Sequence, residues 1–490
     1  MVEYKNSRNG YDKYNKYKYR NKKDDSTIET FNLSPLISPK SVAVIGASEK
    51  PGKVGTAIMK NYLDVGFDGK LYPVNLNSDT IMGIKAYKSI LDIKGEIDLA
   101  VIAIRAEFVP KVLEECGKAH VKGVVLVSSG FSEVGNTTLQ DKIVSISKKY
   151  NMPLIGPNCL GIMNPASRND TLFLPTFKID RPKVGGVSFV VQSGAVGSTI
   201  LDLISSEGFG LSKFISYGNA AVVDEVDILN YLAHDPQTKV IVLYIEGVKR
   251  GKEFMKVAKE LSKHKPVIAL KGGVTDAGAN AAFSHTASLT GSSAAYEAAF
   301  RQSGFIVAHD FKDMLYFAKI FETQPLTTGN RVAIITNGGG VGVLTTDAVY
   351  LNNLVLAELS KPSQKKLRKI MPSIVNIKMP LDIGGDADDV RYKNALDAVI
   401  NDPNVDAIIV VTLFQTPGAD EKVADMLIDY GTGSKKPLVA ISMGGSYTQA
   451  HKSIIEEEGV PVYDSPSAAA RSIAALIKYA EFRKDTKNLK

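Results

Sequence analysis

The sequence predicts an α/β protein in which a Rossmann-like domain is followed by two flavodoxin-like domains, each built on a parallel sheet. From residue 33 onward, short runs rich in Val and Ile alternate with longer helical stretches, and most runs end near glycine. Near-continuous apolar runs are typical of strands buried on both faces, as in parallel sheets. A chain of 490 residues also has room for about three such domains.

The predicted strands fall into three groups along the chain, and these groups set the expected domains. The runs lie at residues 41–47, 99–104, 123–129, 186–194, 240–247, 266–273, 331–340, 407–413 and 437–445. The segments 165–186 and 322–330 between the groups are rich in Pro and turn-forming residues, which is typical of linkers. We therefore expect a Rossmann-like domain over 33–168 and flavodoxin-like domains over 180–325 and 328–485.

The second and third domains resemble two copies of one plan. Each opens with a strand that runs into a glycine-rich turn, VSFVVQSGAVGS at 187–198 and VAIITNGGGVGV at 332–343. Each has a DP dipeptide before a later strand, and each closes with a similar segment, KPVIALKGG at 265–273 and KPLVAISMGG at 436–445. This self-similarity indicates an internal duplication of a flavodoxin-like domain.

Residues 1–32 are expected to be a disordered basic tail. The first 25 residues carry eight Lys or Arg and four Asp or Glu, and their only strongly apolar residues are Met1 and Val2. Such a segment cannot bury a core. Its interleaved Tyr and Lys would suit a single-stranded nucleic acid. However, the tail supplies +4 of the net charge of +7, so the rest is nearly neutral and we expect no nucleic-acid partner.

Composition also argues against membrane, secreted and metal-dependent classes. The longest apolar runs, such as 407–414, are too short to span a bilayer, and the N-terminus has no apolar signal core. Two cysteines, Cys116 and Cys159, form no CxxC pair or Cys/His cluster. We therefore expect a cytoplasmic protein with no membrane segment and no metal site of its own.

The first glycine-rich turn predicts a phosphate-bearing ligand. Gly46, Gly52 and Gly55 follow the strand SVAVI, where they let the backbone approach a ligand, and the next helix offers its N-terminal amides to phosphate. The turn is not a GxGxxG, and the following strand ends at Asn75, where an NAD site has an acidic residue. A nucleotide other than NAD fits better, and a tight turn without ligand is the alternative.

Two further turns repeat this device in the second and third domains. Ser193, Gly194 and Ala195 stand at one predicted helix start, and Asn337 to Gly340 stand at the other. The chain has no GxxxxGK[ST] motif and no kinase motif set. We therefore predict that it handles phosphate without holding ATP itself.

His285 is the candidate nucleophile. It lies among small polar residues in FSHTASLTGS, just before a predicted helix. Glu246 ends the buried strand VIVLYIEG, at the sheet edge where ligands gather in such folds. If Glu246 accepts a hydrogen bond from one ring nitrogen of His285, the other nitrogen is free to attack. The alternative is an ordinary exposed loop histidine.

A set of motifs carries a resemblance to a known family. SVAVIGASEKPGKVG, SSGFSEVG, GPNCLGIMNP, VVQSGAVGS, YIEG, SHTASLTGS and TNGGGVGV occur in this order. Together they resemble the α subunit of the ADP-forming acyl-CoA (acetate–CoA) ligases, relatives of succinyl-CoA synthetase. The resemblance covers residues 33–485, and GPNCLGI and SHTASLTGS are its most specific motifs.

The resemblance implies roles for individual residues. His285 would be the transiently phosphorylated histidine, Glu246 would orient it, and the helix start at Ser193, Gly194 and Ala195 would stabilise the phosphohistidine. Arg105, where the family often has Pro, would add a cation near CoA. The first domain would bind CoA through Gly46, Ala47, Ser48, Gly52, Lys53, Val54, Gly55, Asn75, Ser129, Gly130 and Asn158.

The resemblance also implies a reaction and a partner. Acetyl-CoA or another acyl-CoA, phosphate and ADP would give the carboxylate, ATP and CoA through an acyl phosphate and a phosphohistidine. Mg²⁺ and ADP would bind on a separate ATP-grasp β subunit, in an α2β2 heterotetramer. The acyl group and the choice between ADP and GDP stay open. The alternatives are a CoA-binding part of an acyltransferase, which predicts a fused acetyltransferase segment that we do not find, and a CoA-sensing protein.

Overall fold

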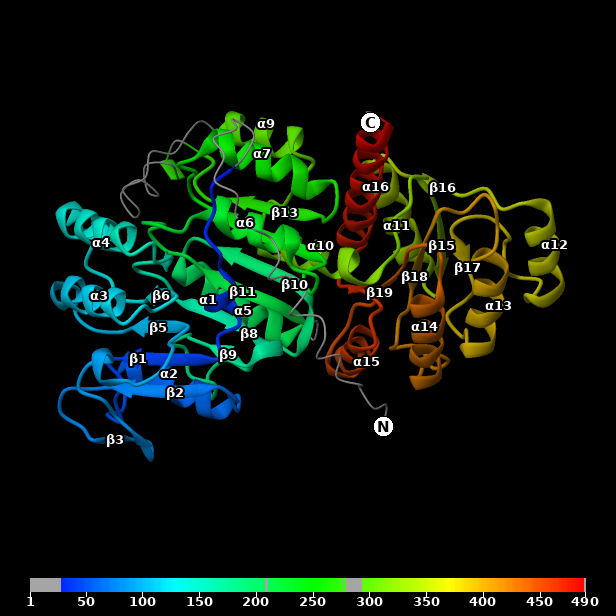
Figure 1. Ribbon diagram of the computed structural model, residues 1–490. Helices are drawn as coiled ribbons and strands as arrows, with labels where there is room; N and C mark the ends of the chain where they lie inside the picture. Colours follow the sequence, from blue (N-terminus) through cyan, green and yellow to red (C-terminus); the bar gives the residue numbers. More distant parts are fainter. Residues whose placement is uncertain (1–27, 208–209, 276, 279–292, 489–490) are drawn as a thin grey trace. The chain divides into compact units, whose positions relative to one another are not determined.

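Three sheets organise the computed structural model, which describes residues 28–207, 210–275, 277–278 and 293–488 (Figure 1). The predicted disordered tail, apart from residues 28–32, and the predicted nucleophile His285 lie outside the described residues. Each sheet corresponds to one of the three predicted strand groups.

The first sheet has the strand order β2-β1-β5-β6-β7, and all its neighbouring strands are parallel. A separate antiparallel ribbon pairs β3 with β4. The strands are β1 Ser41–Ile45, β2 Lys70–Val74, β3 Thr80–Ile81, β4 Ile84–Lys85, β5 Leu99–Ile102, β6 Gly123–Leu126 and β7 Leu154–Ile155. The helices are α1 Ser34–Ile37, α2 Val54–Asp64, α3 Val109–Lys118 and α4 Thr137–Lys149, with short 3₁₀ turns at Ile90–Asp92, Ala106–Phe108, Ser132–Val134 and Pro165–Ser167.

The second sheet has the order β14-β13-β12-β10-β11-β8-β9. Its strands are β8 Gly161–Asn164, β9 Asn169–Asp170, β10 Val184–Val191, β11 Leu211–Ser216, β12 Val240–Ile245, β13 Val267–Lys271 and β14 Ile306–Val307. Its helices are α5 Gly194–Ser206, α6 Glu225–His234, α7 Gly251–Ser262, α9 Ser293–Gln302 and α10 Phe311–Thr323. The parallel part of the sheet is extended by β8 and β9, which pair antiparallel. The expected end of the first domain at residue 168 falls between these two strands.

The third sheet has the order β16-β15-β18-β19-β20, with β17 also paired to β15. Its strands are β15 Arg331–Thr336, β16 Val355–Leu356, β17 Leu381–Asp382, β18 Ala407–Val411, β19 Leu438–Ile441 and β20 Val462–Tyr463. Its helices are α11 Gly339–Leu351, α12 Lys361–Ile370, α13 Asp389–Val399, α14 Glu421–Gly433, α15 Ser446–Glu457 and α16 Pro466–Asn488. Numbered within each domain, the main strands of all three sheets follow the flavodoxin-like order 2-1-3-4-5.

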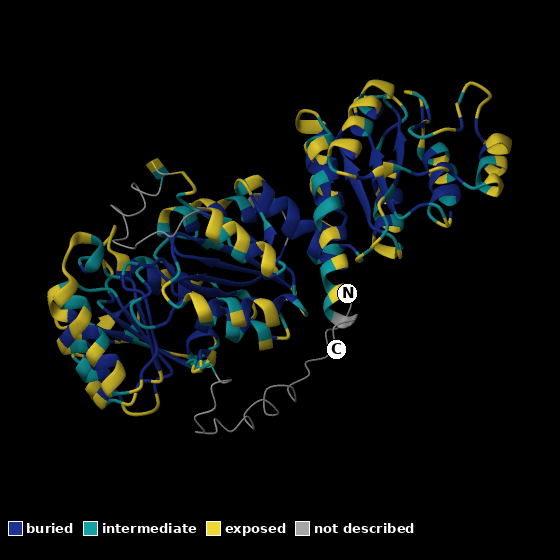
Figure 2. Cartoon of the chain, turned by 90° about the horizontal axis from the view of Figure 1, so that it is seen from above, coloured by how far each residue is buried: buried dark blue, intermediate teal, exposed yellow. Residues whose placement is uncertain are grey.

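Burial explains why the apolar runs form strands. Every residue of β1 and of β18 is buried, and Figure 2 shows dark blue strands between helices that expose one side. One apolar core continues from the second sheet into the third through α10 and α16, where the rings of Phe321 and Tyr479 lie 5.5 Å apart. The buried Lys319 ammonium on α10 also donates to Glu456 on α15, at 2.7 Å. The last two domains therefore share a core.

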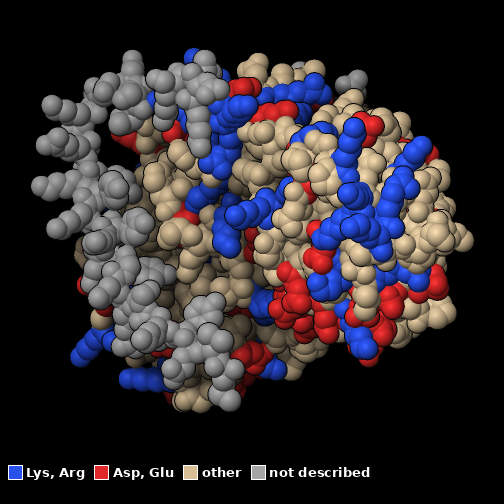
Figure 3. Space-filling model, turned by 90° about the vertical axis from the view of Figure 1, so that its right-hand side faces the viewer, with Lys and Arg blue, Asp and Glu red and all other residues tan. Residues whose placement is uncertain are grey.

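The described part of the chain bears on the membrane and metal-dependent classes. No helix there is long and apolar enough to cross a membrane. No group of three or more His, Cys, Asp or Glu side chains there could hold a metal ion. The face drawn in Figure 3 carries Lys and Arg interspersed with Asp and Glu, as on an ordinary solvated surface.

Candidate functional site

A cavity of about 1230 Å³ lies where the carboxyl ends of the first and second sheets meet. Ligands in doubly wound folds bind at this edge, beside the point where the strand order reverses. The walls include the turns after β1, β5, β6 and β7 of the first sheet and after β10, β11 and β12 of the second. The predicted site residues that line it are Gly46, Ser48, Lys53, Val54, Gly55, Ser129, Gly130, Asn158, Ser193, Gly194, Ala195 and Glu246.

Two glycines shape the turn after β1. Gly46 has a φ of +93°, and a Cβ there would lie 2.4 Å from the carbonyl oxygen of Ala103. A Cβ on Gly55 would lie 2.0 Å from the carbonyl oxygen of Gly46, so only glycine lets α2 start this close to β1. No side chain caps α2, which begins after Lys53. Its first amides can therefore serve an anion in the cavity.

Three predicted CoA-binding residues do not line the cavity. Ala47 is buried, and Gly52 is exposed in the turn with a φ of +77°. The Asn75 side-chain amide donates to the carbonyl oxygen of Ala47 at 2.8 Å, and its oxygen accepts from the amide of Asn77 at 2.7 Å. Asn75 therefore holds the turn in shape, and direct contact of these three residues with CoA stays a prediction.

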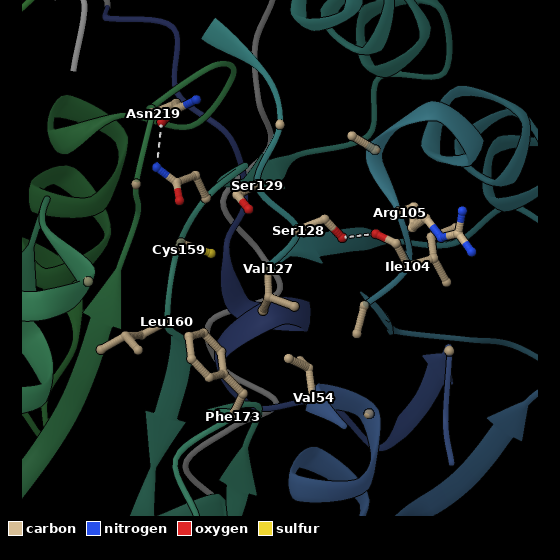
Figure 4. Close-up of a pocket in the computed structure, with 18 of the residues that line it drawn as sticks. Val54, Ile104, Arg105, Val127, Ser128, Ser129, Cys159, Leu160, Phe173 and Asn219 are labelled. Carbon is tan, nitrogen blue, oxygen red and sulfur yellow. Dashed lines mark hydrogen bonds between the residues drawn. The ribbon is translucent and has the colours of Figure 1, made fainter. Parts of the chain in front are cut away.

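The middle of the cavity has an apolar part and a polar part (Figure 4). Val54, Val127, Leu160 and Phe173 give the apolar part, while Ser128, Ser129 and Asn219 lie on the other side. Arg105 also lines the cavity; its side chain is largely exposed, and its Nη1 lies 3.6 Å from Glu107 Oε1. A role for Arg105 toward CoA stays a prediction.

Cys159 is the thiol of this cavity. It is buried, and its Sγ donates to the carbonyl oxygen of Leu126 at 3.4 Å. Burial raises the pKa of Cys159 to about 12, which keeps it protonated and unsuited to nucleophilic attack.

Asn219 is a cavity residue that the sequence analysis missed. Its Nδ2 donates to Glu133 Oε2 at 2.6 Å, and its Oδ1 accepts from Asn158 Nδ2 at 3.3 Å. The other oxygen of Glu133 accepts from the Gly130 amide at 2.6 Å. Burial alone would raise the pKa of Glu133, but hydrogen bonds from Asn219 and Gly130 hold that pKa below its usual value. Asn219 therefore fixes the SSGFSEVG loop against the second domain.

Gln192 is a second residue that the sequence analysis missed. Its side-chain oxygen accepts from the Glu246 amide at 2.7 Å and from the Gly247 amide at 3.2 Å. This bond ties the end of β10 to the end of β12. Ser193, next in the chain, caps α5 by accepting from the Val196 amide at 3.4 Å. The predicted anion-binding helix start and the predicted carboxylate are thus held side by side.

Glu246 is 7% exposed and lies at the cavity wall. The Tyr244 hydroxyl donates to Glu246 Oε1 at 3.4 Å. Since His285 lies outside the described residues, its pairing with Glu246 stays a prediction. The helix after it, α9, confirms the predicted helix, and its Tyr296 hydroxyl accepts from the amide of Val248 at 2.9 Å. The helix that follows His285 in the sequence is therefore hydrogen-bonded to the backbone two residues beyond Glu246.

The third glycine-rich turn lies at the carboxyl end of β15. Asn337 Oδ1 accepts from the Leu413 amide at 2.9 Å, and Gly338 stands at the start of α11. A Cβ on Gly339 would lie 2.7 Å from Asp382 Oδ2. A carboxylate therefore stands beside this helix start, whereas a serine hydroxyl caps the equivalent start of α5.

Comparison with known proteins identifies the family. Three family models match consecutive segments: a CoA binding domain at residues 40–165, a succinyl-CoA ligase like flavodoxin domain at 184–321 and a ligase-CoA domain at 332–484. The subunit α of acetate–CoA ligase (ADP-forming) II from Pyrococcus furiosus is 42% identical over 457 residues, or 92% of this chain and 98% of the relative. The chain belongs to the α-subunit family of the ADP-forming acetate–CoA ligases, in the succinyl-CoA synthetase superfamily.

Longer members of the family also match. The acetate–CoA ligase (ADP-forming) of Methanocaldococcus jannaschii is 46% identical over 454 residues, which are 92% of this chain and 64% of the relative. The 4-hydroxybutyrate–CoA ligase (ADP-forming) of Nitrosopumilus maritimus is 39% identical over 460 residues, 92% of this chain and 65% of the relative. The chain thus spans about two thirds of the length of these two relatives.

A solved structure of the family supports the fold. The dinucleotide forming acetyl-coenzyme A synthetase 1 of Candidatus Korarchaeum cryptofilum, in complex with phosphate and ADP, aligns with a TM-score of 0.88 and 36% identity. The alignment covers 94% of this chain and 99% of that chain. The predicted family and the predicted fold class are therefore confirmed.

Proposed function

We propose that the chain is the α subunit of an ADP-forming acyl-CoA ligase, with acetyl-CoA as its acyl-CoA. One observation carries the proposal: a single cavity joins the Gly46–Gly55 turn of the CoA-binding domain to Glu246 and the Ser193 helix start. An enzyme that moves an acyl group from CoA to phosphate needs these two parts in one space.

The proposed reaction has two steps in this chain. A phosphate oxygen attacks the thioester carbonyl carbon, the carbon–sulfur bond breaks, and CoA leaves as the thiolate. A ring nitrogen of His285 then attacks the phosphorus of the acyl phosphate, and the carboxylate leaves with the electron pair of the broken phosphorus–oxygen bond. The proton on the other ring nitrogen stays hydrogen-bonded to Glu246, whose charge balances the phosphohistidine.

The last step takes place on a partner. The phosphoryl group passes from His285 to ADP on an ATP-grasp β subunit, which also binds Mg²⁺, in an α2β2 assembly. Relatives that are named subunit α support a separate partner chain. The 4-hydroxybutyrate relative, at 39% identity, makes that acid the main competitor to acetate as the product.

Co-expression with an ATP-grasp chain tests the proposal. The purified complex is given ADP, phosphate and a panel of acyl-CoAs that includes acetyl-CoA and 4-hydroxybutyryl-CoA, and ATP formation is followed. We expect ATP from acetyl-CoA and none in His285→Ala, while His264→Ala, in the turn after α7 and with an exposed side chain, serves as the matched control. Full activity in His285→Ala, or CoA binding with no ATP from any acyl-CoA, contradicts the proposal.

A further inference from the structure

Lys271 lies beside Glu246 and has no role in the function proposed above. It is the last residue of β13, and in the parallel register it stands opposite Ile245, the residue before Glu246. Only 8% of it is exposed. A lysine this deep in a sheet usually needs a carboxylate or several acceptors, because an unpaired buried charge is costly.

The contacts of Lys271 do not account for its burial. Its ammonium donates to the carbonyl oxygen of Gly272 and lies 4.8 Å from the centroid of the Tyr296 ring. It makes no salt bridge within 4.0 Å to any carboxylate of the described residues. Burial lowers the pKa of Lys271, and attraction to Glu246 works against that lowering. Among the described carboxylates, Glu246 is therefore the one whose negative charge acts on this lysine.

The other polar groups that the structure describes around Glu246 do not supply a positive charge. Tyr244 and Tyr217 lie near it, and Tyr296 binds the amide of Val248, two residues further along the chain. Burial raises the pKa of each phenol, so all three are neutral. The Lys249 ammonium donates to the carbonyl oxygens of Asn219 and Ala220, at 3.1 and 3.0 Å. Arg250 is bound to Asp224 and Asp227. Among the described residues, this leaves Lys271 as the cation whose charge acts on Glu246 without a carboxylate partner of its own.

The duplicated domain shows that the fold does not require this lysine. The KP dipeptides align KPVIALKGG with KPLVAISMGG, which places Ser442 at the position of Lys271. The same alignment of strand ends places Leu413 at the position of Glu246. By contrast, Lys265 and Lys436 are equivalent, and both donate to backbone carbonyls near a DP dipeptide. Structural lysines are thus kept in both copies, whereas Lys271 occurs only together with Glu246.

We propose that Lys271 is a positioning residue of the phosphoryl-transfer site, whose buried positive charge keeps Glu246 an ionised carboxylate able to hold the nucleophilic histidine. This inference rests on the proposed function. An ionised Glu246 accepts the hydrogen bond from the imidazole and balances the positive ring formed when nitrogen binds phosphorus. Without Lys271, the buried carboxylate would take up a proton. It could then neither accept the hydrogen bond from the imidazole nor balance the positive ring.

The test uses the full chain and ³²P-labelled acetyl phosphate, which needs no partner subunit. Attack by the histidine forms a nitrogen–phosphorus bond, releases acetate and leaves an acid-labile label on the protein. We expect Lys271→Gln, which keeps a donor toward Gly272 but loses the charge, to label about 100-fold more slowly than the wild type. Lys271→Met is the second variant, with melting temperature as the check that each is folded. Lys265→Gln, at the opposite end of β13, is the matched control and labels at the wild-type rate.

A double variant separates positioning from a mere effect on the fold. If Lys271 acts through Glu246, Lys271→Gln/Glu246→Gln labels no more slowly than Glu246→Gln alone. Wild-type labelling in both Lys271 variants, or losses that simply multiply in the double variant, overturns the inference. A wild-type chain that takes up no acid-labile label overturns the proposed function instead, so the two failures are distinct.

Discussion

The second and third domains share a scaffold and differ in the side chains at the ends of their strands. Both follow the order 2-1-3-4-5, and in both a side-chain amide after the first strand accepts from the backbone after the third. Gln192 does this for the Glu246 amide at 2.7 Å, and Asn337 does it for the Leu413 amide at 2.9 Å. The difference lies in Ser193, Glu246 and Lys271, which are replaced by Gly338, Leu413 and Ser442. The two domains thus have the same fold, while the residues proposed for catalysis occur in the second domain alone.

The strongest test of this contrast replaces Glu246 of the second domain by leucine, the residue at the equivalent position of the third domain. Glu246→Leu removes the carboxylate that orients His285, and we expect ATP formation to fall about 10³- to 10⁴-fold, as when an orienting carboxylate is removed from a catalytic triad. Rapid-quench labelling and steady-state assays measure this. Leu413→Ala, at the equivalent position, is the control and keeps the wild-type rate. Equal losses in the two variants would refute the contrast.

The hydrogen bonds that the side-chain oxygens of Gln192 and Asn337 accept from the backbone should matter for stability in both domains and for activity in one. Gln192→Leu and Asn337→Leu each leave buried backbone amides without an acceptor, so each is expected to lower the free energy of unfolding by about 1–3 kcal/mol. Only Gln192→Leu moves Glu246, and we expect it to lower kcat about 10- to 100-fold. Urea unfolding and ATP formation provide the two readouts. A similar kcat loss in Asn337→Leu would show that both turns serve the reaction equally.

The residue before the first helix also differs between the two domains: it is Ser193 before α5 and Gly338 before α11. Ser193→Gly copies Gly338 and removes a weak cap, which costs only a few tenths of a kcal/mol when glycine is the replacement. If the hydroxyl binds phosphate, the KM for phosphate should rise about 10-fold, in line with one lost hydrogen bond to a charged group. Asp388→Gly, which removes the cap of α13, is the control. An unchanged KM for phosphate would exclude the hydroxyl from the site.

The sequence predicted the main strands because their apolar runs are buried on both faces. It missed β11, whose residues are all buried although it contains Ser212 and Lys213. Lys213 is paired with Asp235 at 3.0 Å and with Gln237 at 2.7 Å, so a polar-looking run forms a central strand. The two-residue strands, such as β7 and β20, are too short to show a periodicity.

The candidate site was predicted at its glycine turns and at Glu246, which follow apolar strands directly. Gln192 and Asn219 could not be singled out, because their partners come from loops that are distant in sequence. Asn219 binds Glu133, which lies in another domain, and Gln192 binds the backbone of Glu246 and not a side chain. The proposed role of Lys271 could not be predicted from the sequence, because it depends on the strand register that pairs Lys271 with Ile245 and on the comparison with Ser442.

A further difference between the two domains concerns Glu225, which follows the cap of α6 as Asp389 follows the cap of α13. Glu225 is buried whereas Asp389 is only partly buried, and burial together with Asp224 raises the pKa of Glu225 to about 8. Between the ordinary glutamate pKa of about 4.3 and this raised value, the folded chain holds the proton more tightly than the unfolded chain does. Stability therefore falls as pH rises through this window.

Urea unfolding at pH 6 and pH 9 measures this loss of stability. Glu225→Gln, which is neutral at both pH values, is expected to lose less stability between them than the wild type, by on the order of 2 kcal/mol. Asp389→Asn is the matched control and should keep the wild-type pH dependence, because Asp389 is only partly buried and the variant leaves the buried carboxyl group of Glu225 in place. Parallel pH profiles for Glu225→Gln and the wild type would mean that Glu225 stays ionised in its buried position. The two copies would then differ in the placement of this carboxylate but not in its charge.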